Sequence, residues 1–318
     1  MRIAATRLFL FLAASMLLVR ADAMAQSAGV PAKRIALTFD DAPRAPGAFL
    51  TPDERGKRLL AALRAAGVRQ VAFFVNPGAV KGEADTARLS GYAAAGHVLA
   101  NHSFTHPHLK STDAAAYLAD IDKAETWLKG RPGYRPWFRF PFLDEGGPDK
   151  AKRDAVRAGL KARGLQNGYV TVDGSDWNME QLTIDAVKAG KTIDRAALRD
   201  LYVETHVESA NFAHGLMQQA IGRAPAQVML LHETDLAALY IGDLIAALRK
   251  DGWEIISPDR AYADPIHEAM PDTPWAAGTL TEALAWEKKL PAPRWYARND
   301  TKIANALFAA RVLHQEAQ

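Results

Sequence analysis

"IALTFDD", residues 35–41, is a run of β-branched and other apolar residues that ends on two adjacent carboxylates, Asp40 and Asp41. A run of this kind predicts a strand. Neighbouring side chains of a strand point to opposite faces, so the two acids need not perform the same task. The alternative, a solvated strand end that caps the next helix, does not suit a pair that follows so apolar a strand.

Outward from this strand, short apolar runs alternate with amphipathic segments. Such alternation predicts an α/β fold, with a parallel sheet covered by its crossover helices and either open or closed as a barrel. In these folds, the residues that bind ligands and perform catalysis lie at the carboxyl ends of the strands. The expected strands are residues 34–41, 70–77, 97–103, 137–142, 167–173, 228–233 and 253–257, and the expected helices are 53–67, 83–96, 111–130, 151–163 and 235–252.

Two regions do not follow this alternation of strands and helices. Residues 178–227 are predicted to be mainly helical and are long for a single crossover, so we interpret them as an insertion in a domain that spans residues 33–257. Residues 258–318 contain several prolines and tryptophans. We expect them to form an extension that docks on the barrel, because aromatic residues more often serve burial; a glycan-binding segment is the alternative.

The first 25 residues have the pattern of a secretory signal peptide. Arg2 and Arg7 precede a short apolar run, and small residues at 23–25 offer a cleavage point. A membrane anchor is the alternative, but the run is shorter than the roughly 20 residues that span a bilayer. We therefore expect an exported protein, periplasmic or secreted, with no stable membrane span after cleavage.

Composition excludes several classes of function. The chain has a net charge of +3, of which the leader contributes +2, and no Lys/Arg cluster interleaved with aromatic residues occurs, so a nucleic-acid partner is not expected. With 0 cysteines, disulfides, thiolate metal sites and cysteine nucleophiles are excluded. Any metal must therefore be bound by His, Asp or Glu.

A histidine pair follows the strand expected at 97–103. His102 and His106 are four residues apart, which on a helical turn places both imidazoles on one face. They could be polar surface residues, or they could bind a metal with Asp41 as a facial set. Asp40, free of the metal, could then take a proton from water. The other histidines are expected to flank the site or to lie on the surface or at caps: His97, His108, His206, His214, His267 and His314.

Three further stretches carry polar residues at strand ends. Arg139 in "RFPF" could orient Asp40 or form a surface ion pair. "DGSDW" offers Asp173 and Asp176, together with Trp177, which could also be a core residue. His232 in "LLHE" could donate a proton near neutral pH or be a satisfied strand-end histidine.

The ordered series "TFDD", "HSFTH", "RFPF", "DGSDW" and "LLHE" resembles the five motifs of the polysaccharide deacetylases, the NodB-homology or carbohydrate esterase family 4 enzymes. The resemblance covers residues 33–257 and implies a distorted (β/α) barrel of the NodB type. One short motif would be weak evidence, but five in order are specific.

The resemblance also implies a role for each matching residue. Asp40 would be the general base, and Asp41, His102 and His106 would bind a divalent metal, with zinc expected and cobalt, nickel or manganese as alternatives. Arg139 would orient the base, and Asp176 would support the catalytic acid, His232. The backbone N–H of Phe142 would help to bind the oxyanion, and Trp177 and Leu230 would enclose the acetyl methyl group.

The third motif departs from the usual Arg-Pro-Pro-Tyr, because Phe140 and Phe142 occupy two of its positions. The expected oxyanion donor at Phe142 is the backbone N–H, so replacing tyrosine by phenylalanine there should not affect the reaction. The identity of the substrate is not determined by this motif. The expected activity is metal-dependent removal of acetyl groups, N-acetyl rather than O-acetyl, from an acetylated polysaccharide or oligosaccharide. The alternatives are hydrolysis of small amides or cyclic imides, an iron oxygenase, and a non-catalytic glycan-binding protein.

Overall fold

The computed structural model describes residues 33–275 and 277–315, so the predicted leader lies outside the described residues. The strands form one sheet in which every pairing is parallel. Its order is β5-β4-β3-β2-β1-β7-β6, with β8 paired to the start of β1. The strands are β1 (Lys33–Ala42), β2 (Ala72–Val75), β3 (Val98–Asn101), β4 (Tyr134–Phe138), β5 (Gln166–Asn167), β6 (Val172–Asp173), β7 (Gln227–His232) and β8 (Trp253–Ile255).

The sheet curls into a half-barrel. Its two edge strands, β5 and β6, are consecutive in the chain and are joined by residues 168–171 alone, so the edges must approach each other. The expected continuous strand 167–173 is therefore wrong. Gly168 N–H donates to Phe138 O on one side of the gap and Thr171 N–H to Val228 O on the other, so the segment crosses between edges instead of pairing along one. The predicted α/β class and barrel architecture are confirmed.

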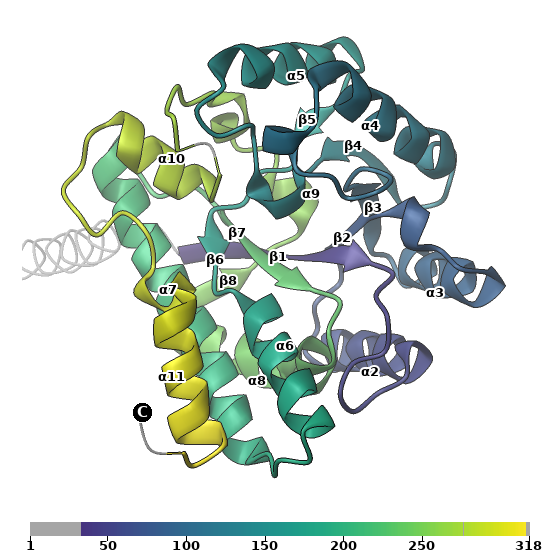
Figure 1. Ribbon diagram of the computed structural model, residues 1–318, viewed down its shortest axis with the longest axis vertical. Helices are drawn as coiled ribbons and strands as arrows, with labels where there is room; N and C mark the ends of the chain where they lie inside the picture. The colour runs from purple at the N-terminus through teal and green to yellow at the C-terminus, as the bar shows by residue number, and fades with distance from the viewer. Residues whose placement is uncertain (1–32, 276, 316–318) are drawn as a thin grey trace, which may run out of the picture. The chain divides into compact units, whose positions relative to one another are not determined.

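Helices surround the strands (Figure 1). Several begin at side-chain caps, such as Thr51, which forms a capping box with Glu54. The helices are α2 (Pro52–Ala65), α3 (Glu83–Ala94), α4 (Ala114–Leu128), α5 (Lys150–Ala162), α6 (Asp176–Lys188), α7 (Arg195–Ile221), α8 (Asp235–Lys250), α9 (Pro258–Ala261), α10 (Leu280–Glu287) and α11 (Thr301–Val312). None of the helices in the described ranges is both long and apolar enough to cross a membrane.

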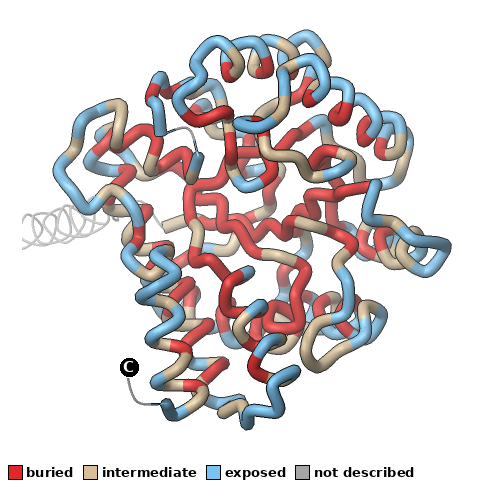
Figure 2. Tube along the Cα trace, in the orientation of Figure 1, coloured by how far each residue is buried: buried red, intermediate tan, exposed pale blue. Residues whose placement is uncertain are grey.

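Side chains of β1 alternate between two parts of the core. Ile35 and Phe39 belong to the cluster that packs against helices such as α2 and α8, whereas Ala36 belongs to a second cluster that includes Phe74 and Tyr169. The central strands are buried along most of their length (Figure 2). This burial holds their carboxyl ends, and the polar residues there, in fixed positions.

The segment expected to be a helical insertion contains most of α6 and the whole of α7, and α7 packs against α8. Residues of the C-terminal extension cover the gap between the sheet edges. Leu280 N–H donates to Val170 O at 2.7 Å, and the Thr281 hydroxyl donates to Thr171 O at 2.8 Å. The extension thus contributes to the half-barrel itself, while the division into a domain and an extension at residue 257 stays a prediction.

Two histidines expected on the surface or at caps are buried. His206 lies within α7 with its Nδ1 at 2.7 Å from Tyr202 O. His97 is 4% exposed and its Nδ1 accepts a hydrogen bond from Val71 N–H. Burial lowers the pKa of His97 to about 4.

We expect His97 to make the protein less stable in mild acid. Below pH 6.5 an unfolded histidine binds a proton, whereas folded His97 remains neutral until about pH 4, so stability is lost as the pH falls through this window. Between pH 7 and pH 4.5 the loss from this residue is about 2 kcal/mol. Urea unfolding of the wild type and His97→Gln at both pH values measures it. An equal loss in the two proteins would contradict the assignment.

Candidate active site

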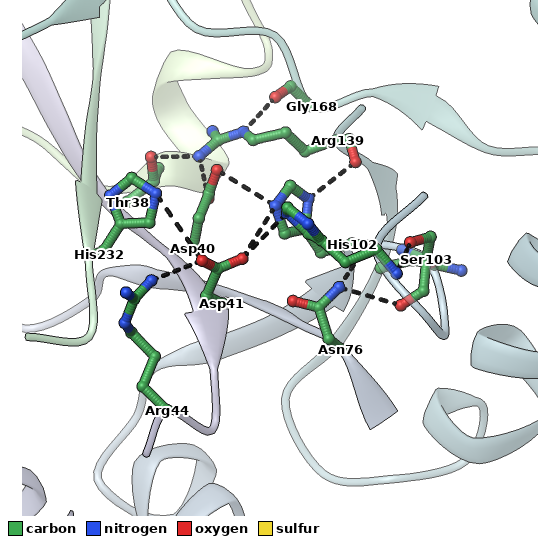
Figure 3. A network of polar contacts seen from close by, with 12 residues as sticks. Thr38, Asp40, Asp41, Arg44, Asn76, His102, Ser103, Arg139, Gly168 and His232 are labelled. Carbon is green, nitrogen blue, oxygen red and sulfur yellow. Dashed lines mark hydrogen bonds and ion pairs between the residues drawn. The ribbon is translucent and has the colours of Figure 1, made fainter. Parts of the chain in front are cut away.

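Both carboxylates at the end of β1 face the same cluster of side chains (Figure 3). Asp40 is the register partner of His232 on β7. Asp41 adopts a left-handed conformation, with φ 61°, which breaks the alternation of the strand. As a result, Asp40 Oδ2 and Asp41 Oδ1 each lie 3.6 Å from His102 Nε2.

The two histidines converge through an irregular loop after β3, and not through the helical turn that their spacing would allow. Ser103 and His106 have φ values of 64° and 59°, and Ser103 Oγ accepts a hydrogen bond from His106 N–H. Asn101 Oδ1 accepts another from Ser103 N–H at 2.7 Å. These local bonds fold the loop so that the imidazole centroids are 4.9 Å apart.

Asp41, His102 and His106 form a possible metal site, with one ligand atom from each within 4.8 Å of the others. His102 Nδ1 lies 2.9 Å from Arg139 O and can donate to it, which leaves Nε2 free to bind a cation. Asp41 Oδ1 is buried and lies 3.1 Å from His106 Nε2 and 3.6 Å from His102 Nε2, but no described residue makes a hydrogen bond of good geometry to it. A divalent cation would satisfy this oxygen, so the residues fit a metal.

A buried ion pair fixes Asp40 beside this group. Arg139 is 1% exposed and donates from Nη1 to Asp40 Oδ1 at 2.5 Å, so it is not a surface ion pair. Its Nε donates to Gly168 O, and its remaining nitrogen donates to the Tyr262 hydroxyl at 2.8 Å. Because the guanidinium is held at both ends, Asp40 Oδ2 is oriented toward His102.

His232 lies on the opposite side of Asp41 from His102 (Figure 3), with its Nε2 4.0 Å from Asp41 Oδ2. Its Nδ1 is 2.7 Å from Asp176 Oδ1, and its backbone N–H donates to Asp176 Oδ2 at 2.8 Å. Asp176 is fully buried at the start of α6. Burial disfavours the charged imidazole, but Asp176 and Asp41 outweigh it and raise the pKa of His232 to about 9.

The cluster opens into a cavity of about 770 Å³, within the range typical of ligand sites. Phe142, Trp177 and Leu230 all line it, together with Asp40, Asp41, His102, His106 and His232. The ring of Phe142 lies edge-on to His106, with centroids 4.4 Å apart, and so covers one side of the metal group. Arg139 and Asp176 do not line the cavity, but they contact Asp40 and His232, which do.

Sequence reasoning missed several residues that support this site. Arg44 donates to Asp41 Oδ2 at 2.5 Å, Asn76 donates to the backbone oxygen of His102, and Thr38 accepts from Arg139 at 2.9 Å. Asn76 could have been found, because it follows an apolar strand as the other site residues do. Tyr262 had no such pattern, since it lies in the C-terminal extension.

Residues 27–163 match the family model described as polysaccharide deacetylase. The matched part is less than half of the chain. It contains the first three motifs, while Asp176, Trp177, Leu230 and His232 follow it. The resemblance identified from the sequence is confirmed. No curated protein matches the chain.

Solved structures with a similar fold include deacetylases and a pseudoenzyme. A chitin deacetylase from the fungal pathogen Colletotrichum lindemuthianum has a TM-score of 0.50 at 18% identity, over 71% of this chain and 85% of that chain. A family 4 carbohydrate esterase from Streptomyces lividans has a TM-score of 0.47 at 22% identity, over 72% and 95%. A family 4 pseudoenzyme from Bacillus anthracis has a TM-score of 0.49 at 19% identity, over 71% and 63%. At 18% identity, the similarity to the chitin deacetylase is evidence for the fold only.

Proposed function

We propose that this protein is a metal-dependent hydrolase of the polysaccharide deacetylase family that removes acetyl groups, N-acetyl in preference to O-acetyl, from an envelope or extracellular polysaccharide. The observation that carries the proposal is the meeting of a metal-binding triad, a free carboxylate and a carboxylate-supported imidazole in one cavity. The proposed location is outside the cytoplasm, periplasmic or secreted.

Asp41, His102 and His106 would hold the cation, with zinc expected because it accepts imidazole and carboxylate ligands and keeps positions open in catalytic sites; cobalt, nickel or manganese are alternatives. When bound, the cation would lower the pKa of a water molecule toward about 7 and polarise the acetyl carbonyl.

The remaining residues divide the proton transfers between them. Asp40 Oδ2 faces the metal ligands and takes the proton of the attacking water, while Arg139 keeps this carboxylate in position. The backbone N–H of Phe142 donates to the tetrahedral oxyanion. His232 gives its proton from Nε2 to the departing nitrogen, because Nδ1 is engaged by Asp176. Trp177 and Leu230 enclose the acetyl methyl group.

Acetate release across a panel of substrates tests the proposal. The metal-loaded protein is incubated with chitooligosaccharides, peptidoglycan and acetylated xylan, and ring opening of cyclic imides and hydrolysis of small amides are measured in parallel. We expect acetate from at least one glycan and loss of activity after treatment with a chelator. Imide or small-amide hydrolysis alone would favour a small-molecule hydrolase, and glycan binding without acetate release would favour a non-catalytic protein.

His232→Ala is expected to lower turnover by about 10²- to 10⁴-fold, the usual loss for a general acid, without loss of metal. The metal triad does not include His232, so metal content by elemental analysis should equal that of the wild type. His267→Ala, in a short 3₁₀ helix of the extension, is a control that should retain activity. Loss of metal together with activity would show that His232 is a ligand and not the acid.

A further inference from the structure

The C-terminal extension forms one wall of the active-site cavity. This wall faces the same space as the metal triad, although its residues follow the matched family region by more than a hundred positions. The extension residues that line the cavity are Ala277, Gly278, Glu282, Trp295, Asn299 and Asp300.

Hydrogen bonds tie this wall to the loop that precedes Asp176. Asn299 Nδ2 donates to Asp173 O at 3.1 Å, and the Ser175 hydroxyl donates to Asn299 Oδ1 at 3.0 Å. The Asn299 side chain takes part in both bonds, so it fixes the position of this wall relative to the loop that leads to Asp176 and its partner His232. It is therefore positioned relative to the reacting groups.

Trp295 is the large apolar side chain of this wall. The residues on either side of it are anchored: Arg294 stacks over the ring of Trp286 at 4.0 Å, and the hydroxyl of Tyr296 donates to Glu208 at 2.7 Å. Trp295 itself is 52% exposed and lines the cavity. The local chain thus anchors both neighbours of Trp295 and leaves the indole exposed at the cavity.

The surroundings of Trp295 match the surface of a sugar ring. A pyranose has an apolar face of C–H groups and a rim of hydroxyls, and an indole provides a flat apolar surface for such a face. On the same wall, Asn299 and Asp300 carry oxygens that can accept hydrogen bonds from hydroxyls. A small amide or imide held at the metal triad would leave this wall without a partner, whereas a glycan chain would cover it.

We propose that Trp295 is a stacking platform for a sugar next to the acetyl-bearing one, so that the substrate is an oligosaccharide or polysaccharide and not a small amide. This proposal rests on the proposed function for the identity of the reaction. It adds that Trp295 of the extension makes the protein prefer longer glycan substrates.

The test compares Trp295→Ala and Trp295→Phe with a matched control, Trp275→Ala. Trp275 is a 57% exposed tryptophan of the same extension that stacks on Trp286 outside the cavity lining. Binding of N-acetylglucosamine and of its oligomers up to the pentamer is measured by calorimetry with each protein. Acetate release from the same oligomers gives kcat and KM.

Trp295→Ala is expected to weaken binding of the pentamer roughly ten-fold and to raise its KM, with a smaller effect on the monosaccharide, which has no neighbouring sugar, because one stacking contact contributes about one factor of ten. Trp295→Phe should recover part of the loss, and Trp275→Ala should behave as the wild type. An equal loss for all lengths, or no loss for the pentamer, would overturn the proposal.

The two proposals can fail separately. Length-dependent binding that needs Trp295, without acetate release, would retain the platform and reject the deacetylase. Acetate release that is indifferent to Trp295→Ala would retain the deacetylase and reject the platform. No binding of any oligomer by the wild type, tested also with acetylated xylo-oligosaccharides, would reject the platform.

Discussion

Asp40→Asn is expected to lower acetate release by about 10²- to 10⁴-fold, the usual cost of removing a general base, while metal content is unchanged. Asparagine has nearly the same shape and can still accept the hydrogen bond from Arg139, so the buried pair keeps its geometry. It cannot take a proton from water. Metal content by elemental analysis, together with kcat from acetate release, separates the two effects.

A matched acid far from the site provides the control for this variant. Asp243 lies in α8, outside the cavity lining, and Asp243→Asn should retain full turnover. Near-normal turnover of Asp40→Asn would remove the assignment of Asp40 as base. Loss of metal in that variant would instead make Asp40 a ligand.

His102→Ala is expected to weaken metal binding by at least about 100-fold and to abolish activity with it. Replacing a residue that merely supports a ligand costs 10- to 100-fold in affinity, and removal of a ligand should cost no less. Titration of the metal-free protein with zinc, followed by calorimetry, measures the affinity without depending on turnover.

His108→Ala is the control for metal binding, because this nearby imidazole stacks on Phe142 at 3.6 Å but is not part of the triad. It should bind zinc as the wild type does. Equal affinity of His102→Ala and the wild type would exclude His102 as a ligand. The same titration with cobalt, nickel and manganese ranks the candidate metals.

The candidate site was largely predictable because its residues stand at the ends of apolar strands. Asp40, Asp41 and His232 end strands β1 and β7, which are neighbours in the sheet, so their proximity follows from the parallel arrangement. The periodic helices were predicted close to their observed limits: α5, expected at 151–163, spans Lys150–Ala162. Local sequence carries this information, since apolar periodicity and caps determine single elements.

The conformation of the loops was not predictable in the same way. The left-handed residues Asp41, Ser103 and His106 bring the triad together, yet none of them is glycine or asparagine. Their backbone is held by tertiary contacts, such as the bonds from Asn76 to the backbone of the histidine loop. Spacing alone therefore suggested a helical turn where the chain forms an irregular loop.

The sequence by itself determined the fold class and the residue types of the candidate site, because strand and helix periodicity and the residue types at strand ends are local properties. The tertiary structure alone decided how the half-barrel is covered and what faces the cavity. Tyr262 supports Arg139, and Trp295 lines the cavity, although both belong to an extension that has no recognisable motif. Contacts between segments so distant in the chain arise from packing of the whole core, which no local pattern records.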